Sequence, residues 1–225
     1  MIQLKGNNRT QDRRLDRIRE FDDRSRNFPI RTLIAEQKPR SYTWNCPIWL
    51  DQKREGACVG YAFAHEAAAR PVKVQGVNEI TARKVYEDAK LNDQWPGESY
   101  EGTSVLGGAK ACVKRGWYTE YRWAFSLDDV LLTIGYHGPV VLGIDWYEGM
   151  MDANSIGLIR VAGRISGGHS ILAVGVSLRK RLVRLHNSWG KDWGLDGDCY
   201  ISFDDLDKLL IAQGEACVPI GRKLV

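Results

Sequence analysis

Apolar positions divide the chain into a helical first half and a strand-rich second half. The alanine-rich run 58–70 is apolar on every face and ends at Pro71, which predicts a buried helix. The stretches 80–93 and 104–116 have the periodicity of helices, and Gly116 closes the second one. After about residue 136, short apolar runs alternate with glycine-bearing turns, which predicts strands. These runs are "GPVVLGIDW", "SILAVGVSL", "RLVRLHNSW" and "GDCYISF".

Two weaker patterns precede these elements. Leu15, Ile18 and Phe21 form a thin apolar line within 10–26, which predicts a weakly amphipathic helix, most simply a solvated one. A short inhibitory pro-segment and a docking helix for a partner are the alternatives. Between residues 28 and 50, three prolines favour an extended segment lying across a folded body. A helical half followed by a β half predicts an α+β protein with two lobes and a cleft between them.

Composition supports a folded globular protein. The chain has 225 residues, 44% of them hydrophobic, and a net charge of +4. Residues 1–40 hold eleven Lys and Arg against six Asp and Glu, but acids are interspersed and no nucleic-acid-binding motif is present. No apolar run is long enough to span a bilayer, and the N-terminus lacks a signal-peptide pattern. We therefore expect a cytoplasmic protein that binds neither nucleic acid nor membrane.

The five cysteines are an odd number without the density of a disulfide scaffold or a CxxC pair. We expect mostly reduced thiols, with one disulfide, such as Cys199 with Cys217, left open. No metal or organic cofactor is implied by the chain.

Cys58 begins the buried helix, where the positive end of the helix stabilises a thiolate. His65 lies two turns along the same predicted helix and cannot reach the sulfur. His169 follows two glycines at the entrance to a strand, a position that suits a general base, and Asn187 can hold its imidazole through a hydrogen bond. Gln52 and the Cys58 backbone N–H can bind a developing oxyanion.

Each role in thiol acyl transfer therefore has a candidate residue. Trp189 or Trp193 is expected to shield the bond between His169 and Asn187 from water. The remaining histidines, His137 and His186, are expected to be structural.

These residues resemble the papain-like cysteine peptidases, family C1. The resemblance lies in Gln52 and Cys58 at an offset of six, in "GGHSILAVGV" and in "NSWGKDWGLDGDCYISF". Pro39 and Trp44 extend it from about residue 38 to the C-terminus. It implies a papain-like domain over 38–225, with a helical lobe at about 45–135 and a β-barrel-like lobe at about 136–225. Residues 1–37 would then be a basic leader or short pro-segment, shorter than the usual pro-domain of the family.

The resemblance also implies a substrate cleft. Its expected lining is Gly102, Thr103, Ser104, Val105, Gly143, Gly168 and Trp189. The pocket bounded by Ser104, Val105, Gly143 and Gly168 is small or apolar and is expected to accept an apolar side chain. Glu55 and Val59 depart from the secreted members, which have a disulfide cysteine and an aromatic residue there. The chain is thus more similar to bacterial or phage-borne members than to lysosomal ones.

The resulting expectation is a cysteine-type endopeptidase that hydrolyses polypeptides through Cys58, His169, Asn187 and Gln52. Residues 1–37 would provide a self-inhibitory contact or a partner-binding contact. Two alternatives stay open. One is a thiol amidase or transferase that acts on a non-protein substrate such as cell-wall peptide. The other is a non-catalytic binding protein with a papain-like fold.

Overall fold

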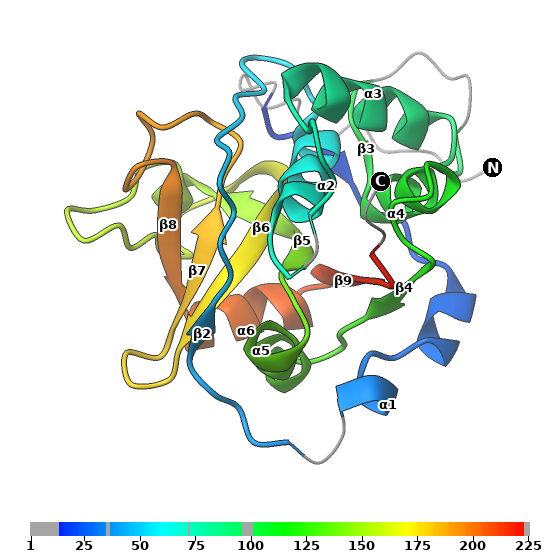
Figure 1. Cartoon of the computed structure of the whole chain (residues 1–225). Helices are drawn as coiled ribbons and strands as arrows, with labels where there is room; N and C mark the ends of the chain where they lie inside the picture. The colour runs from blue at the N-terminus through cyan, green and yellow to red at the C-terminus, as the bar shows by residue number, and fades with distance from the viewer. Residues whose placement is uncertain (1–13, 35–36, 72, 96–100, 223–225) are drawn as a thin grey trace.

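The structure is a computed structural model that describes residues 14–34, 37–71, 73–95 and 101–222. Residues 1–13 and 35–36 of the predicted leader lie outside this part of the chain. Most helices precede the sheet in sequence, as predicted (Figure 1). The helices, including two 3₁₀ helices marked η, are η1 Asp23–Asn27, α1 Arg31–Ile34, α2 Cys58–Ala68, α3 Glu79–Lys90, α4 Val105–Lys114, α5 Leu127–Tyr136, η2 Glu148–Met150 and α6 Phe203–Ile211. The strands are β1 Arg17–Ile18, β2 Tyr42–Thr43, β3 Thr103–Ser104, β4 Glu120–Trp123, β5 Val140–Tyr147, β6 Ile165–Ser177, β7 Leu182–His186, β8 Asp198–Ser202 and β9 Glu215–Ile220.

Helices α2, α3 and α4 pack together beside the sheet (Figure 1). Every residue of α2 is buried, as its apolar sequence predicts. The side chain of Asn78 caps α3, and that of Ser104 caps α4 by accepting a hydrogen bond from the Gly107 N–H. Ala57 at the start of α2 provides no side-chain cap. The first N–H groups of α2 therefore have no side-chain cap and can donate hydrogen bonds to a group at the start of the helix, where Cys58 lies.

The second half of the chain forms an antiparallel sheet in the order β4-β9-β5-β6-β7-β8, and β2 also pairs with β6. All four strand predictions are confirmed. One apolar core lies between the sheet and helices α5 and α6, and a second lies between the sheet and helices α2 and α4. Of the helices that the structure describes, none has the length and apolar character needed to cross a membrane.

The N-terminal segment, residues 14–28, is not the helix that the spacing of Leu15, Ile18 and Phe21 predicted. It is mainly extended, and only Asp23–Asn27 forms a short 3₁₀ helix. Strand β1 pairs in parallel with β3, and Asp16 makes a parallel bridge with Gly168 of β6. The segment therefore inserts between β3, on the helical side, and the central sheet, and tertiary pairing overrides the weak helical pattern.

Candidate active site

Cys58 is the first residue of α2 and is fully buried. The backbone N–H groups of Ser170 and Val59 donate hydrogen bonds to its sulfur. Ser170 directly follows His169, so the packing of α2 against β6 brings the thiol to the histidine-bearing part of the strand. Burial raises the pKa of the Cys58 thiol to about 11, and the Asp16 carboxylate adds to the increase. In this state the thiol is protonated at neutral pH.

His169 is held by Asn187 in the arrangement that the sequence predicted. The His169 Nε2 and the Asn187 Oδ1 are 2.8 Å apart in the buried interior. The Asn187 Oδ1 also accepts a hydrogen bond of 2.8 Å from the Ser188 N–H, which identifies it as the carbonyl oxygen of the amide. The His169 Nε2 must therefore donate, and in the neutral ring Nδ1 carries the lone pair. This tautomer gives Nδ1 the lone pair that a general base needs.

Two tryptophans contact this histidine, and a third packs on both of them. Trp189 lies with its ring 5.0 Å from the His169 ring, as expected of the predicted shield, and Trp193 packs on Trp189. Trp146 of β5 lies closer, at 4.8 Å, and is fully buried. The sequence analysis did not identify Trp146, although its place in the alternation of an apolar strand marks it as core. The apolar rings exclude water and strengthen the bond between His169 and Asn187.

Gln52 is buried and its amide is fixed in one orientation. Its Oε1 accepts a hydrogen bond of 2.6 Å from the Ser188 hydroxyl. Its Nε2 donates to the Glu55 carbonyl at 2.7 Å and to the carbonyl of Arg14, in the N-terminal segment, at 3.3 Å. The peptide carbonyl of Arg14 thus already accepts a hydrogen bond from the Gln52 Nε2, the donor that we expect to bind the oxyanion.

The N-terminal segment follows the predicted cleft. An added Cβ at Gly102 would lie 1.8 Å from the Asp16 carbonyl oxygen, and one at Gly168 would lie 2.2 Å from that of Arg17. Only glycine permits this close approach of two backbones. Thr103 is held in place by its hydroxyl, which donates to Asp93 at 2.7 Å. The residues predicted to line the cleft therefore contact an extended peptide of the same chain.

The predicted pocket contains an ion pair rather than an apolar side chain. The Arg17 guanidinium enters it and lies 3.6 Å from the Glu215 carboxylate, and these side chains are 1% and 2% exposed. An added Cβ at Gly143 would lie 2.6 Å from Val105 and 2.9 Å from the Arg17 Nε. Burial raises the pKa of Glu215 to about 7 against the opposing effect of Arg17, and burial lowers the pKa of Arg17.

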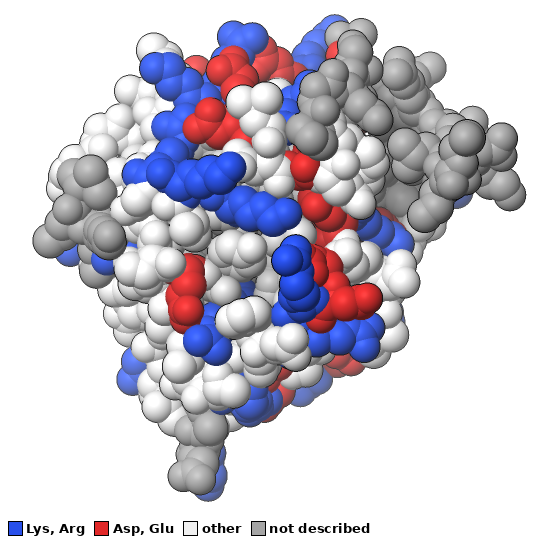
Figure 2. All heavy atoms as spheres, turned by 90° about the vertical axis from the view of Figure 1, so that its right-hand side faces the viewer, with Lys and Arg blue, Asp and Glu red and all other residues white. Residues whose placement is uncertain are grey.

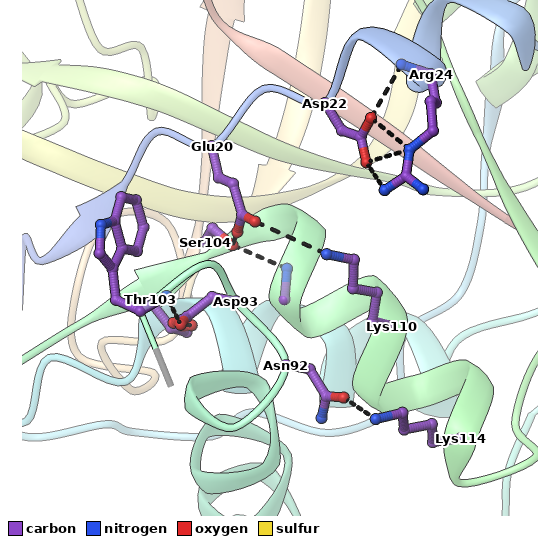
Figure 3. Close-up of polar contacts among 11 residues, drawn as sticks. Glu20, Asp22, Arg24, Asn92, Asp93, Thr103, Ser104, Lys110 and Lys114 are labelled. Carbon is purple, nitrogen blue, oxygen red and sulfur yellow. Dashed lines mark hydrogen bonds and ion pairs between the residues drawn. The ribbon is translucent and has the colours of Figure 1, made fainter. Parts of the chain in front are cut away.

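Neighbouring residues of the segment add further polar contacts. The Glu20 carboxylate accepts a hydrogen bond from the Ser104 hydroxyl and lies 3.7 Å from the Lys110 ammonium, as Figure 3 shows. Arg19 pairs with the Asp145 carboxylate of β5 and donates to Gln213 at 3.0 Å. Burial raises the pKa of Glu20. The outer face nearby presents both signs of charge, interspersed as in the sequence (Figure 2).

The other cysteines and histidines lie outside this site. All five cysteines are free and buried, so the structure does not form the Cys199–Cys217 disulfide that the sequence left open. His186 bonds to Asp198 at 2.6 Å and to the Ile48 carbonyl at 2.8 Å, and His137 terminates α5, as expected of structural residues.

Comparison with known sequences finds relatives whose names describe them as similar to cysteine peptidases. No family model matches the chain. An uncharacterized peptidase C1-like protein of Acanthamoeba polyphaga mimivirus is 22% identical over 196 residues, covering 66% of this chain and 62% of the relative. A cathepsin B-like cysteine proteinase of Schistosoma japonicum is 41% identical over 64 residues, covering 27% of this chain and 18% of that protein. The alignments thus span under two thirds of each relative.

Solved structures match over nearly the whole chain. Xylellain, a cysteine protease from Xylella fastidiosa, has a TM-score of 0.72 at 18% identity and covers 97% of this chain and 100% of its own. Procathepsin L2 from the larval midgut of Tenebrio molitor has a TM-score of 0.59 at 16% identity and covers 91% of this chain and 77% of its own. These matches confirm the predicted α+β fold of papain type.

Proposed function

We propose that this chain, which belongs to the papain-like C1 family of cysteine peptidases, is an endopeptidase that hydrolyses peptide bonds through a thioester intermediate. His169 takes the proton of the Cys58 thiol, and the sulfur attacks the carbonyl carbon of the substrate. The negative oxygen is bound by the Gln52 Nε2 and the Cys58 N–H. His169 then protonates the leaving amine, and later takes a proton from the water that hydrolyses the thioester.

The observation that carries this proposal is the Arg14 carbonyl on the Gln52 amide, 3.3 Å away. A peptide carbonyl at an oxyanion donor, in a cleft whose glycines admit an extended backbone, favours polypeptide over a non-protein substrate. The segment lies across the cleft at Gly102 and Gly168, and burial of the Cys58 thiol in this state raises its pKa. We therefore infer that residues 14–20 inhibit the site until they leave it.

The test uses the full chain with Arg17→Glu, which places a second carboxylate against Glu215 and expels the segment by repulsion. This variant is expected to hydrolyse a mixed peptide library and to be labelled on Cys58 by an epoxysuccinyl inhibitor, located by mass spectrometry. Adding Cys58→Ala should reduce hydrolysis at least about 10⁴-fold, because no other described group of the site can replace the nucleophile. The matched control is Cys112→Ala, a buried thiol in α4 that lies outside the site.

Three outcomes would contradict the proposal. Hydrolysis that persists in the Cys58→Ala variant would exclude the nucleophile. Cleavage of cell-wall fragments with no cleavage of peptides would favour the amidase or transferase. A Cys58 that reacts no faster than a free thiol in the Arg17→Glu variant would favour a binding protein.

A further inference from the structure

A thiol, two imidazoles and a carboxylate lie together outside the candidate active site. The Cys46 sulfur is 3.5 Å from the His65 carbonyl oxygen and 3.8 Å from that of Ile48. It is also hydrogen-bonded to the His186 imidazole, whose Nδ1 lies 2.6 Å from the Asp198 carboxylate. The His65 ring packs edge-on against the His186 ring, with 4.4 Å between the ring centroids. A cysteine, a histidine and an acid thus meet in a cluster that the proposed reaction does not use.

The contacts that hold His186 in place also give its ring a positive charge. Its Nδ1 faces the Asp198 carboxylate, and its Nε2 lies 2.8 Å from the Ile48 carbonyl oxygen. Both partners can only accept hydrogen bonds, so both ring nitrogens carry a proton. Burial disfavours the charged ring, but the hydrogen bonds with Asp198 and Cys46 raise the pKa of His186 to about 10. A cation therefore lies beside the Cys46 sulfur at neutral pH.

The position of Cys46 suits reaction with a small electrophile. An imidazolium next to a thiol favours the thiolate, which is the nucleophilic form. Cys46 is 8% exposed, whereas Cys112, Cys199 and Cys217 are fully buried. Burial raises the pKa of these three thiols and keeps them protonated. The small opening at Cys46 admits a small molecule and excludes a bulky one.

His65 provides a donor that the cluster leaves unused. Its Nε2 accepts a hydrogen bond of 3.1 Å from the Leu50 N–H, so Nδ1 carries the proton of the neutral ring. Burial, with a further contribution from His186, lowers the pKa of His65 and keeps the ring neutral. Among the residues that the structure describes, none accepts a hydrogen bond from this buried Nδ1. A buried donor without an acceptor costs free energy, and an oxygen atom added to the cluster would be an acceptor.

We propose that Cys46 is a modification site at which a small hydroperoxide oxidises the thiol to a sulfenic acid. The thiolate sulfur attacks one peroxide oxygen, and an S–O bond forms as the O–O bond breaks. The leaving hydroxide takes up the proton that the thiol released, so thiol and hydrogen peroxide give sulfenic acid and water. The charge of His186 stabilises the sulfur anion, and the added oxygen accepts the hydrogen bond from the His65 Nδ1. Cys58 takes no part, so this inference is independent of the proposed peptidase function.

The experiment oxidises the full-length Cys58→Ala protein with hydrogen peroxide at about pH 7. Catalase then removes the peroxide, and the protein is unfolded with dimedone, which marks sulfenic acids, and iodoacetamide, which marks the remaining thiols. Mass spectrometry gives the oxidation rate of each cysteine. Cys46 should be oxidised at least about tenfold faster than Cys112, Cys199 and Cys217.

Two further variants in this background test the role of the imidazolium. His186→Gln removes the charge and keeps a hydrogen-bonding side chain, and Asp198→Asn removes the carboxylate that stabilises the charge. Each should slow the oxidation of Cys46 at least about tenfold. His137→Gln, at the end of α5, is the matched control and should leave the rate unchanged. Cys199 lies next to Asp198 in β8, and its continued protection shows that a variant remains folded there.

Three results would overturn the inference. The first is oxidation of Cys46 no faster than that of the fully buried thiols in the Cys58→Ala protein, a comparison that stands even if both charge variants expose Cys199. The second is an unchanged rate in His186→Gln or Asp198→Asn with Cys199 still protected. The third is a mixed disulfide formed on Cys46 by oxidised glutathione as fast as the peroxide reaction, which would assign the site to disulfides. Failure of the peptide-cleavage assay would leave all three measurements unaffected.

Discussion

Ser188 connects the two halves of the proposed catalytic site. Its N–H donates to the same Asn187 oxygen that accepts from His169, and its hydroxyl donates to the Gln52 Oε1. The hydroxyl therefore keeps the Gln52 amide from rotating and directs its N–H groups at the carbonyl position. Sequence reasoning did not single out Ser188, because a serine beside Asn187 carries no signal until the fold brings Gln52 to it.

We expect Ser188→Ala, in the full-length Arg17→Glu background, to lower kcat about tenfold with little change in KM. The loss corresponds to about 1.4 kcal/mol, the scale of one hydrogen bond to a group that stabilises the transition state. Steady-state kinetics in a double-mutant cycle with Gln52→Ala measures the coupling. Ser188→Ala should add almost nothing once Gln52 is absent, and an undiminished tenfold loss there would refute the positioning role. Ser177→Ala, at the end of β6, is the control.

Strand β6 combines the proposed catalytic histidine with a glycine that admits a second backbone. Gly168 and His169 are adjacent, so the same strand edge that presents the imidazole also holds the N-terminal segment. The atoms nearest to an added Cβ at Gly168 all belong to Arg17. Substitution at this position should therefore disturb docking of the segment without disturbing the sheet.

Gly168→Ala in the full-length protein is expected to raise the rate of Cys58 alkylation at least about tenfold. The added Cβ would lie 2.2 Å from the Arg17 carbonyl oxygen, a contact that backbone cannot relieve by a rotamer change. Mass spectrometry of the labelled protein gives the rate. Gly135→Ala is the matched control, because its added Cβ would meet Arg40 at 3.3 Å or more. A Gly168→Ala protein as unreactive as wild type would show that the segment does not shield the thiol.

Elements with a strong local pattern were predictable, and the elements made by tertiary pairing were not. The helix after Cys58 was predicted because apolar residues and Pro71 define it locally, and the spacing of Gln52, His169 and Asn187 indicated the site through a family resemblance. Strand β1 has only two residues and exists because β3 lies beside it. Glu215 enters the site because β9 pairs with β5 from far along the chain, so no short stretch of sequence indicates that contact.

Across the whole molecule, docking of the segment is expected to depend on pH through Glu215. Burial raises the pKa of this carboxyl from an ordinary 4.5 to about 7 in the docked state. The charges of Arg17 and Arg19 oppose this increase, and that of Glu20 adds to it. The docked state therefore binds a proton more tightly than the open state does. Docking is strongest below the open-state pKa, and it weakens by up to about tenfold per pH unit as the pH rises toward about 7.

The measurement is the Cys58 alkylation rate of the wild-type chain divided by that of Gly168→Ala, taken between about pH 5 and pH 8. Titration of the Cys58 thiol in the open state affects both rates equally and cancels in this ratio. The ratio should rise with pH as the segment is released. Glu215→Gln should flatten the rise, because the amide has no proton to gain on docking. A ratio that falls with pH, or an equally steep rise in the Glu215→Gln protein, would show that other groups control docking. Because Glu215 lies against Arg17 of the segment, this one carboxyl would set the pH at which the site opens.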